Sequence, residues 1–460
     1  MFDSSNHHKT TIRNPSNKSR PSSKSRSRAG RRPGSKIRPS EKRSAKRPRP
    51  KTKPPAAKRN SGKPSLLKPP ADASSSFKAR RITKKLPFKA VALLLQGGGA
   101  LGAYQAGAYE ALSESGIEPN WLAGISIGAI NAAIIAGNKP QDRVAKLRAF
   151  WEQVTAPRIA SWMDYFDSPL TKGDDARRVL NQISASHALT SGVSGFFGLR
   201  IPGPLLNPAG TPQATSFYDT GALKSTLEKV IDFDRINSDD TRLSVGAVNI
   251  RSGNFVYFDN TERKIGPEHV MASGALPPGF PAVEIEGEHY WDGGTVSNTP
   301  LRWVVENGRR EDTLIFQVDL WSARGEVPNN MMEVVTRQKE IQYSSRTRAN
   351  TDWFIIAKRM RCALASLLPK LPSALKNTPE AKLLASVADH SAYNIVHLIY
   401  RAQNYEGDSK DYEFSRRSMQ EHWRAGYNDA VRTLRHPEVL EKPEGVEGVF
   451  TFDLARDGRE

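Results

Sequence analysis

Two successive strand–turn–helix patterns restrict most strongly what this 460-residue chain can fold into. The apolar run 90–95 (AVALLL) is typical of a strand buried on both faces, and it stops at three consecutive glycines. Apolar residues then recur every three or four positions up to Gly116, which indicates a helix. A second strand over 121–125 leads through Ser126 into a second helix over 127–135. This rhythm predicts an α/β fold with a mostly parallel sheet flanked by helices on both faces.

Further elements follow by the same criteria. Residues 243–248 and 254–258 are predicted to form a strand pair, and 313–318 another buried strand. Later the pattern becomes mainly helical, with a clear amphipathic helix over 419–434. Residues 190–216 set large apolar side chains among glycines and prolines, so this segment is either a packed surface loop or a lid.

Charge is distributed unevenly along the chain. Residues 1–86 contain 27 Lys and Arg but only three acidic residues, a net charge of +24, whereas the remaining residues carry −4. This segment is rich in Pro and Ser and poor in large apolar residues, so we expect a disordered basic tail, without the apolar stretch of a secretory signal. It lacks interleaved aromatic residues, which argues against specific nucleic-acid binding. Peripheral contact with an anionic membrane or granule is one expectation, and a merely solubilising tail is the other.

Three parts are therefore expected: the basic tail (1–87), an α/β domain (88–310), and a C-terminal extension (311–460) with one buried strand followed mainly by helices. The single cysteine, Cys362, excludes a disulfide framework and Cys-rich metal sites and fits a reducing compartment, so a cytoplasmic location is expected. No uninterrupted apolar run reaches the ~18 residues of a transmembrane helix. Neither a metal nor another cofactor is expected.

A glycine-rich turn joins the first strand to the first helix. Gly97, Gly98, Gly99 and Gly102 satisfy G-x-G-x-x-G at a helix N-terminus, where backbone N–H groups hold negative charge. Such a turn binds the pyrophosphate of a dinucleotide or the oxyanion formed during acyl transfer. The third interpretation is a turn that binds nothing and only packs the helix on the sheet. A dinucleotide-dependent oxidoreductase needs an acidic residue at the tip of the second strand. Ser126 stands there instead, which argues against that class.

The second strand ends in a G-x-S-x-G motif formed by Gly124, Ser126 and Gly128. Small residues on both sides permit a sharp turn that exposes the serine hydroxyl, and the following helix N-terminus favours a developing alkoxide. A serine that only caps the helix is the alternative. The strand before it and the helix after it favour a nucleophile. None of the nine histidines lies in an evident triad setting, so a Ser-His-Asp mechanism is not expected.

Together with Asp292-Gly293-Gly294, these two motifs resemble the three signature blocks of the patatin-like phospholipases. The resemblance covers about residues 91–305, and residues 306–440 are similar to the C-terminal extension of one bacterial subgroup. Thr299-Pro300, a helix-start signal after the Asp block, favours a functional loop over a hairpin turn there. The resemblance implies a patatin-like α/β/α sandwich and a serine lipid acyl hydrolase that uses a Ser–Asp dyad.

Carried over by position, the resemblance makes Ser126 the nucleophile and Asp292 the proton acceptor. The loop Gly97–Gly102 would form the oxyanion hole, chiefly through the N–H groups of Gly98 and Gly99. The implied substrate is a lipid ester such as a phospholipid, cleaved through an acyl-enzyme intermediate. Two alternatives stay open: an intracellular polyester or neutral-lipid esterase with the same dyad, and a non-catalytic protein that binds an anionic surface.

Overall fold

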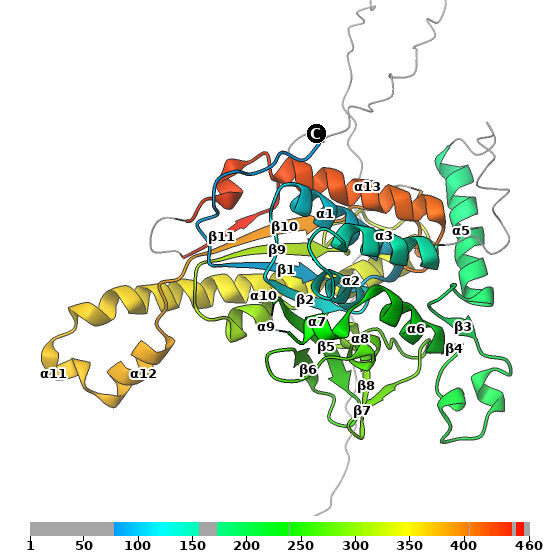
Figure 1. Cartoon of the computed structure of the whole chain (residues 1–460), viewed down its shortest axis with the longest axis horizontal. Helices are drawn as coiled ribbons and strands as arrows, with labels where there is room; N and C mark the ends of the chain where they lie inside the picture. Colours follow the sequence, from blue (N-terminus) through cyan, green and yellow to red (C-terminus); the bar gives the residue numbers. More distant parts are fainter. Residues whose placement is uncertain (1–77, 156–172, 239, 404, 444–447, 455–460) are drawn as a thin grey trace, which may run out of the picture. The chain divides into compact units, whose positions relative to one another are not determined.

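The computed structural model describes residues 78–155, 173–238, 240–403, 405–443 and 448–454. Most of the predicted basic tail therefore lies outside the described residues. Within them, nine strands form one sheet in the order β11-β10-β9-β1-β2-β5-β8-β7, with β6 also paired to β5 (Figure 1). These strands are β1 (Ala90–Leu95), β2 (Trp121–Ile125), β5 (Arg242–Asn249), β6 (Phe255–Asp259), β7 (Val283–Ile285), β8 (Glu288–Asp292), β9 (Thr313–Asp319), β10 (Tyr393–Ile399) and β11 (Val449–Phe452). A separate two-stranded hairpin pairs β3 (Gly198–Leu199) with β4 (Tyr218–Asp219).

The centre of the sheet is parallel, as predicted. Strands β11, β10, β9, β1, β2 and β5 run in one direction, and β6, β8 and β7 add antiparallel pairs next to β5. Leu95 pairs with Gly124, so β1 and β2 end at the same edge of the sheet. The glycine-rich turn and Ser126 therefore leave the sheet side by side, which is where open α/β sheets place their ligand sites.

Helices cover both faces of the sheet and confirm the expected sandwich. Leu93 and Leu95 of β1 point into a core shared with α1, α2, α3 and α13, while Ala92 and Leu94 point into a second core with α9 and α10. This alternation explains why β1 is apolar at every position. The helices are α1 (Gly102–Glu114), α2 (Ile127–Ala136), α3 (Arg143–Val154), α5 (Asp174–Ser191), α6 (Gly221–Val230), α7 (Phe233–Ile236), α8 (Pro267–Ser273), α9 (Leu301–Asn307), α10 (Met331–Leu367), α11 (Ser373–Lys376), α12 (Pro379–Val387) and α13 (Arg416–Thr433).

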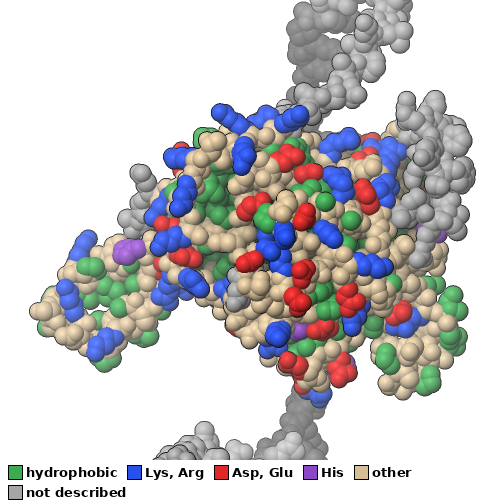
Figure 2. Space-filling view, in the orientation of Figure 1, with side chains coloured by type: hydrophobic (Ala, Val, Ile, Leu, Met, Phe, Trp, Pro, Cys, Tyr) green, Lys and Arg blue, Asp and Glu red, His purple; other side chains and the backbone are tan. Residues whose placement is uncertain are grey.

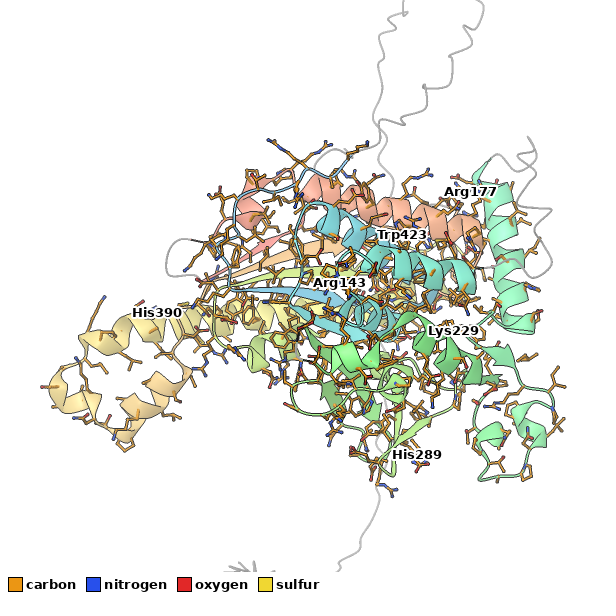
Figure 3. All side chains as sticks on the ribbon, in the orientation of Figure 1. Arg143, Arg177, Lys229, His289, His390 and Trp423 are labelled. Carbon is orange, nitrogen blue, oxygen red and sulfur yellow. The ribbon has the colours of Figure 1, made fainter. Side chains whose placement is uncertain are left out.

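Helix α13 is the predicted amphipathic helix of the C-terminal extension, and it lies against α1 (Figures 1 and 3). The two backbones approach so closely that a Cβ on Gly107 would lie 1.8 Å from the carbonyl oxygen of Trp423. A Cβ on Gly426 would lie 1.9 Å from the carbonyl oxygen of Tyr104. Glycine at these two positions therefore permits the crossing, and it fixes the extension to the first helix of the sandwich.

The C-terminal extension also contributes to the sheet itself. The predicted strand is β9, but β10 and β11 were not predicted, since short strands containing Asn394 and His397 resemble the polar helical sequence around them. All three strands belong to the same sheet as β1, and the domain boundary at residue 310 stays a prediction. None of the described helices is long and apolar enough to cross a membrane.

The end of the predicted tail, residues 78–87, contacts the α/β body. The N–H of Ile82 donates to the carbonyl oxygen of Ser115 at 2.9 Å, and the N–H of Ala79 donates to the hydroxyl of Tyr427 at 3.1 Å. Ile82 and Leu86 pack against the larger core. A truncation that is meant to leave the body intact should therefore end at residue 77.

Candidate active site

Ser126 occupies a sharp, strained turn between β2 and α2. Its backbone has φ 56° and ψ −125°, in the region that L-residues rarely adopt, at a cost of about 1–3 kcal/mol. The flanking glycines allow the turn: a Cβ on Gly124 would lie 2.3 Å from the carbonyl oxygen of Gly128, and one on Gly128 would lie 2.2 Å from that of Leu95. The turn expected of the G-x-S-x-G motif is present, with the serine only partly buried.

Asp292 lies at the end of β8, where it pairs with Ala247 of β5. Its side chain is 2% exposed. It accepts a hydrogen bond from the hydroxyl of Ser126 and another, 2.7 Å long, from the N–H of Gly294. The structure therefore brings together two side chains that are far apart in the sequence. The Gly293 position is tight as well, because a Cβ there would lie 2.7 Å from the carbonyl oxygen of Gly246.

Burial changes the acidity of this carboxyl group. Desolvation raises the pKa of Asp292 from 3.8 to about 6, against the smaller, lowering effects of the hydrogen bonds from Ser126 and Gly294. At neutral pH the group is still mostly ionised, yet it is a stronger base than an exposed aspartate. A base of this kind, in contact with the hydroxyl it would deprotonate, meets the geometric requirement for general-base catalysis.

Ser273, the last residue of α8, holds the Ser126 turn through hydrogen bonds. It is fully buried, its hydroxyl accepts a 2.9 Å hydrogen bond from the N–H of Ser126, and it donates a 2.6 Å hydrogen bond to the carbonyl oxygen of Gly246. One side chain therefore fixes the strained Ser126 backbone relative to β5. No local sequence pattern indicates this role, because the contact joins segments 147 residues apart.

We expect Ser273→Ala to lower kcat about 10- to 100-fold with little change in KM, because the unpaired Ser126 N–H lets the hydroxyl move from its position. The matched control is Ser115→Ala, which removes another buried hydroxyl that donates to a backbone carbonyl, that of Ala111 at 2.8 Å. Steady-state kinetics on a soluble short-chain ester would separate the two. Equal kcat values for the two variants would show that Ser273 does not position Ser126.

The glycine-rich turn is clamped by Asn298. The Oδ1 atom of Asn298 accepts from the N–H of Gly97 at 3.1 Å, and its Nδ2 donates to the carbonyl oxygen of Gly97 at 2.9 Å. The indole N–H of Trp321 donates to the same carbonyl at 2.9 Å. A Cβ on Gly97 would lie 3.0 Å from the Cβ of Ser126, so the clamp holds the turn directly beside the serine.

These hydrogen bonds limit which backbone N–H groups of the glycine-rich turn could bind an oxyanion. The N–H of Gly97 is already occupied, and that of Gly102 donates to the carbonyl oxygen of Gly99. Gly102 has a packing role instead, since a Cβ there would lie 2.5 Å from Ile127. Among the described residues, no acceptor takes a hydrogen bond from the N–H groups of Gly98 and Gly99. Of the four glycines predicted for the oxyanion hole, these two retain free donors.

The C-terminal extension forms part of the site. The carbonyl oxygen of Asp411 accepts a 2.8 Å hydrogen bond from the N–H of Ala100 and lies 2.0 Å from where a Cβ on Gly99 would be. Gly99 also has φ +53°, so this position is restricted to glycine twice over. The ring of Tyr343, from α10, packs on Trp321 with 5.1 Å between ring centroids. Burial, then the charges of Asp292 and Asp411, raise the pKa of Tyr343.

The described histidines do not provide a third catalytic group. None is hydrogen-bonded to Ser126 or Asp292; His422 instead contacts Glu406 in a buried pair. His289 and His390 lie in separate parts of the molecule, on β8 and just before β10 (Figure 3). Within the same described residues, no group of three or more His, Cys, Asp and Glu could hold a metal ion.

A cavity of about 740 Å³ lies elsewhere, between residues 78–87 and 431–442. It is lined by Ser115 and other residues near the start of β1 and the end of α1, at the opposite end of these elements from Gly97 and Ser126. This cavity is therefore separate from Ser126 and Asp292. The site itself is an open edge of the sheet, framed by the glycine-rich turn, the serine turn and the Asp292 loop.

The site thus combines a serine on a strand–turn–helix elbow, a buried carboxylate that contacts it, and two backbone N–H groups that have no acceptor among the described residues. Two family models match the chain, one described as patatin-like phospholipase over residues 93–304 and one described as patatin phospholipase over residues 341–445. The chain belongs to the patatin-like phospholipase family.

Individual relatives are distant or short in their match. The chain is 31% identical to patatin-like phospholipase domain-containing protein 7 of Rattus norvegicus over 99 residues, which are 22% of this chain and 7% of the rat protein. It is similar to the crystal structure of VipD from Legionella pneumophila, with 18% identity, a TM-score of 0.33, and coverage of 78% of this chain and 70% of that one. For the SpcU–ExoU complex of Pseudomonas aeruginosa the identity is 15%, the TM-score 0.22, and the coverage 66% and 68%.

Proposed function

We propose that this protein cleaves fatty-acyl ester bonds of lipids through a Ser126–Asp292 dyad. The observation that carries the proposal is the hydrogen bond between the Ser126 hydroxyl and a carboxylate that is 2% exposed and whose pKa is raised to about 6. The buried Asp259 and Asp389 pair with Arg242 and Lys358, whereas Asp292 has no ion pair among the described residues, so its burial does not stabilise the fold. A raised pKa of a carboxyl group in contact with a partly accessible serine favours a catalytic role.

The proposed reaction has two halves. Asp292 accepts the Ser126 proton as Oγ attacks the ester carbonyl carbon, and the N–H groups of Gly98 and Gly99 hold the resulting oxyanion. Protonated Asp292 then gives its proton to the departing alcohol oxygen, which leaves an acyl group on Ser126. In the second half Asp292 takes a proton from water, the hydroxyl attacks the acyl carbon, and Ser126 recovers its proton as the fatty acid leaves.

Phospholipid is the substrate class we propose, on the strength of the family assignment. The test measures acids released from phospholipid vesicles, a triacylglycerol emulsion and an aliphatic polyester, by purified wild-type protein and by Ser126→Ala. The proposal expects release from phospholipid by wild type alone. Release only from the emulsion or the polyester would favour the neutral-lipid or polyester esterase. Binding to anionic vesicles without release from any ester would favour the non-catalytic alternative.

We further propose that the basic tail holds the enzyme on an anionic membrane or granule, and that the protein is cytoplasmic. Residues 1–77 contain 22 Lys and Arg and three acidic residues. Deleting them should leave turnover of a soluble ester within about twofold, and weaken binding to anionic vesicles more than about tenfold at low salt. The difference should fade above 0.1 M salt, where charges are screened over ~10 Å.

Vesicle co-sedimentation at two salt concentrations measures this difference. A full-length variant with Gln in place of the tail Lys and Arg controls for tail length. It should bind like the deletion variant. If wild type and both variants bind alike at low salt, the tail is not an anchor.

A further inference from the structure

The β3–β4 hairpin carries an exposed apolar loop, residues 200–217, that the proposed chemistry does not use. Ile201, Leu205 and Leu206 in this loop are 88%, 94% and 80% exposed. The loop lies below α5 in Figure 1, and hydrophobic side chains are visible on that part of the surface in Figure 2. Large aliphatic side chains clustered at such exposure on a soluble surface indicate an interaction site.

The apolar loop contains no charged residue between Arg200 and Asp219. This distinguishes it from the exposed apolar residues of α10 to α12, where lysines and arginines stand between the apolar residues. A protein-binding surface tolerates charged side chains at its rim, whereas a segment that inserts into lipid cannot carry charged side chains into the hydrocarbon. The composition of the loop therefore favours a lipid surface as its partner.

Hydrogen bonds at the base of the loop keep its apolar side chains pointing outward. The guanidinium of Arg200 donates to the hydroxyl of Ser216 and to the carbonyl oxygen of Tyr218, both at 3.2 Å. The N–H of Arg200 donates to the carbonyl oxygen of Phe217 at 3.0 Å. Prolines at 202, 204, 208 and 212 further restrict the chain. These hydrogen bonds and prolines hold the loop away from the core.

The same base is attached to the walls of the active site. The N–H of Tyr218 donates to the carbonyl oxygen of Gly279 at 2.9 Å, in the segment that leads to β7 and to Asp292 on β8. The ring of Phe197 lies 5.0 Å from that of Tyr218 and 5.1 Å from that of Phe280.

On the other side of the aromatic cluster, Phe196 lies 5.9 Å from Phe414. Phe414 directly follows the segment whose Asp411 closes over Gly99. The loop is therefore linked to both the aspartate side and the glycine side of the site.

We propose that the apolar loop inserts its aliphatic side chains into a lipid surface and thereby docks the active site on the layer that holds its substrate. This inference rests on the proposed lipid acyl hydrolase function. The loop would act as an interfacial anchor, with the hydrocarbon boundary of the layer taking up Ile201, Leu205 and Leu206.

The first experiment measures binding without catalysis. Full-length Ser126→Ala protein is sedimented with phosphatidylcholine vesicles in 0.5 M salt, which removes most of the electrostatic contribution of the basic tail. Adding Ile201→Ser, Leu205→Ser and Leu206→Ser should weaken binding at least about 30-fold, since each buried aliphatic side chain contributes on the order of tenfold. The control, Met360→Ser, Leu367→Ser and Leu383→Ser, removes three apolar residues of α10 and α12 that are 63%, 54% and 68% exposed, and it should change binding less than about twofold.

Equal binding of the loop variant and its Ser126→Ala parent would overturn the inference and direct attention to a protein partner. Because neither protein is catalytic, that result is independent of the proposed function. A tryptophan reporter checks insertion directly: emission of full-length Leu205→Trp, after subtraction of the parent signal, should be quenched by brominated phosphatidylcholine. Absence of quenching would also overturn the inference.

The second experiment uses the loop substitutions with Ser126 intact. Turnover of vesicle phospholipid should fall at least about tenfold, whereas turnover of a monomeric short-chain ester should stay within about twofold. An equal loss on both substrates would overturn the anchoring role and show instead that the loop shapes the active site. If wild type cleaves no ester at all, the proposed function fails, while the binding result still decides whether the loop inserts.

Discussion

Replacing Ser126 with alanine is expected to lower ester turnover on the order of 10⁶-fold, because the loss of a nucleophile removes the work of the whole catalytic unit. The fold should survive, since alanine meets the same backbone strain as serine at φ 56° and the substitution removes one hydrogen bond to Asp292. Initial rates on a soluble ester, with a thermal unfolding curve beside them, provide the measurement. Ser115→Ala is the control for loss of a serine hydroxyl. Turnover near the wild-type value would remove Ser126 from the mechanism.

Asp292→Asn is expected to be nearly as inactive, and at the same time more stable at neutral pH. The amide keeps the shape but cannot take a proton from Ser126. Raising the pKa of the buried carboxyl from 3.8 to about 6 costs the folded wild-type protein about 3 kcal/mol at neutral pH, as an upper value. The asparagine variant does not pay this cost, so its free energy of unfolding at pH 7 should be higher by about 1–3 kcal/mol.

The sign of this effect sets its pH dependence. Folded wild-type protein binds the Asp292 proton more tightly than the unfolded chain does, so this group stabilises the fold below pH 4 and loses that contribution as the pH rises through about 6. The stability difference between Asp292→Asn and wild type should therefore grow from pH 4 to pH 6 and then remain constant. Denaturant unfolding at pH 4, 5, 6, 7 and 8 measures it. A variant that is active, or several kcal/mol less stable than wild type at pH 7, contradicts this account.

Strain and burial at the dyad thus work against stability. Ser126 adopts a backbone conformation that costs energy, and Asp292 is buried without a cation beside it. The surrounding residues offset these costs with hydrogen bonds: the Ser273 hydroxyl accepts from the N–H of Ser126, and the N–H of Gly294 donates to the Asp292 carboxylate. Such a combination is expected at sites selected for chemistry more than for stability.

The parts of the fold that sequence patterns predicted are those that local physics decides. The continuous apolar run of β1, the helical spacing of α1 and α13, and the G-x-S-x-G turn at Ser126 each need only neighbouring residues to be recognised. Asp292 was assigned from resemblance to a known motif, because no local feature distinguishes its loop from an ordinary turn. Strands β10 and β11 were missed, since pairing of β10 with β9 and of β11 with β10 decides their conformation more than their own composition.

The parts of the site that sequence patterns did not predict depend on long-range contacts. Asn298 and Trp321 hold Gly97 from positions more than 200 residues away. The Asn298 side chain also occupies the N–H of Gly97, so the motif could name four glycines but could not show which of them keep a free N–H. Asp411 packs on Gly99 through its backbone carbonyl and belongs to the C-terminal extension, to which the sequence analysis assigned no chemistry. Only the folded chain reveals that the C-terminal extension completes the site.

The pH dependence of covalent labelling at Ser126 tests the central claim most directly. A fluorophosphonate probe should label wild-type protein at Ser126 alone, with a rate that rises with pH to a plateau and has its midpoint near 6, where Asp292 loses its proton. Asp292→Asn should be labelled at least about 100-fold more slowly, with no midpoint near pH 6. Equal labelling rates for the two proteins, or labelling at a different residue, would contradict the Ser126–Asp292 dyad.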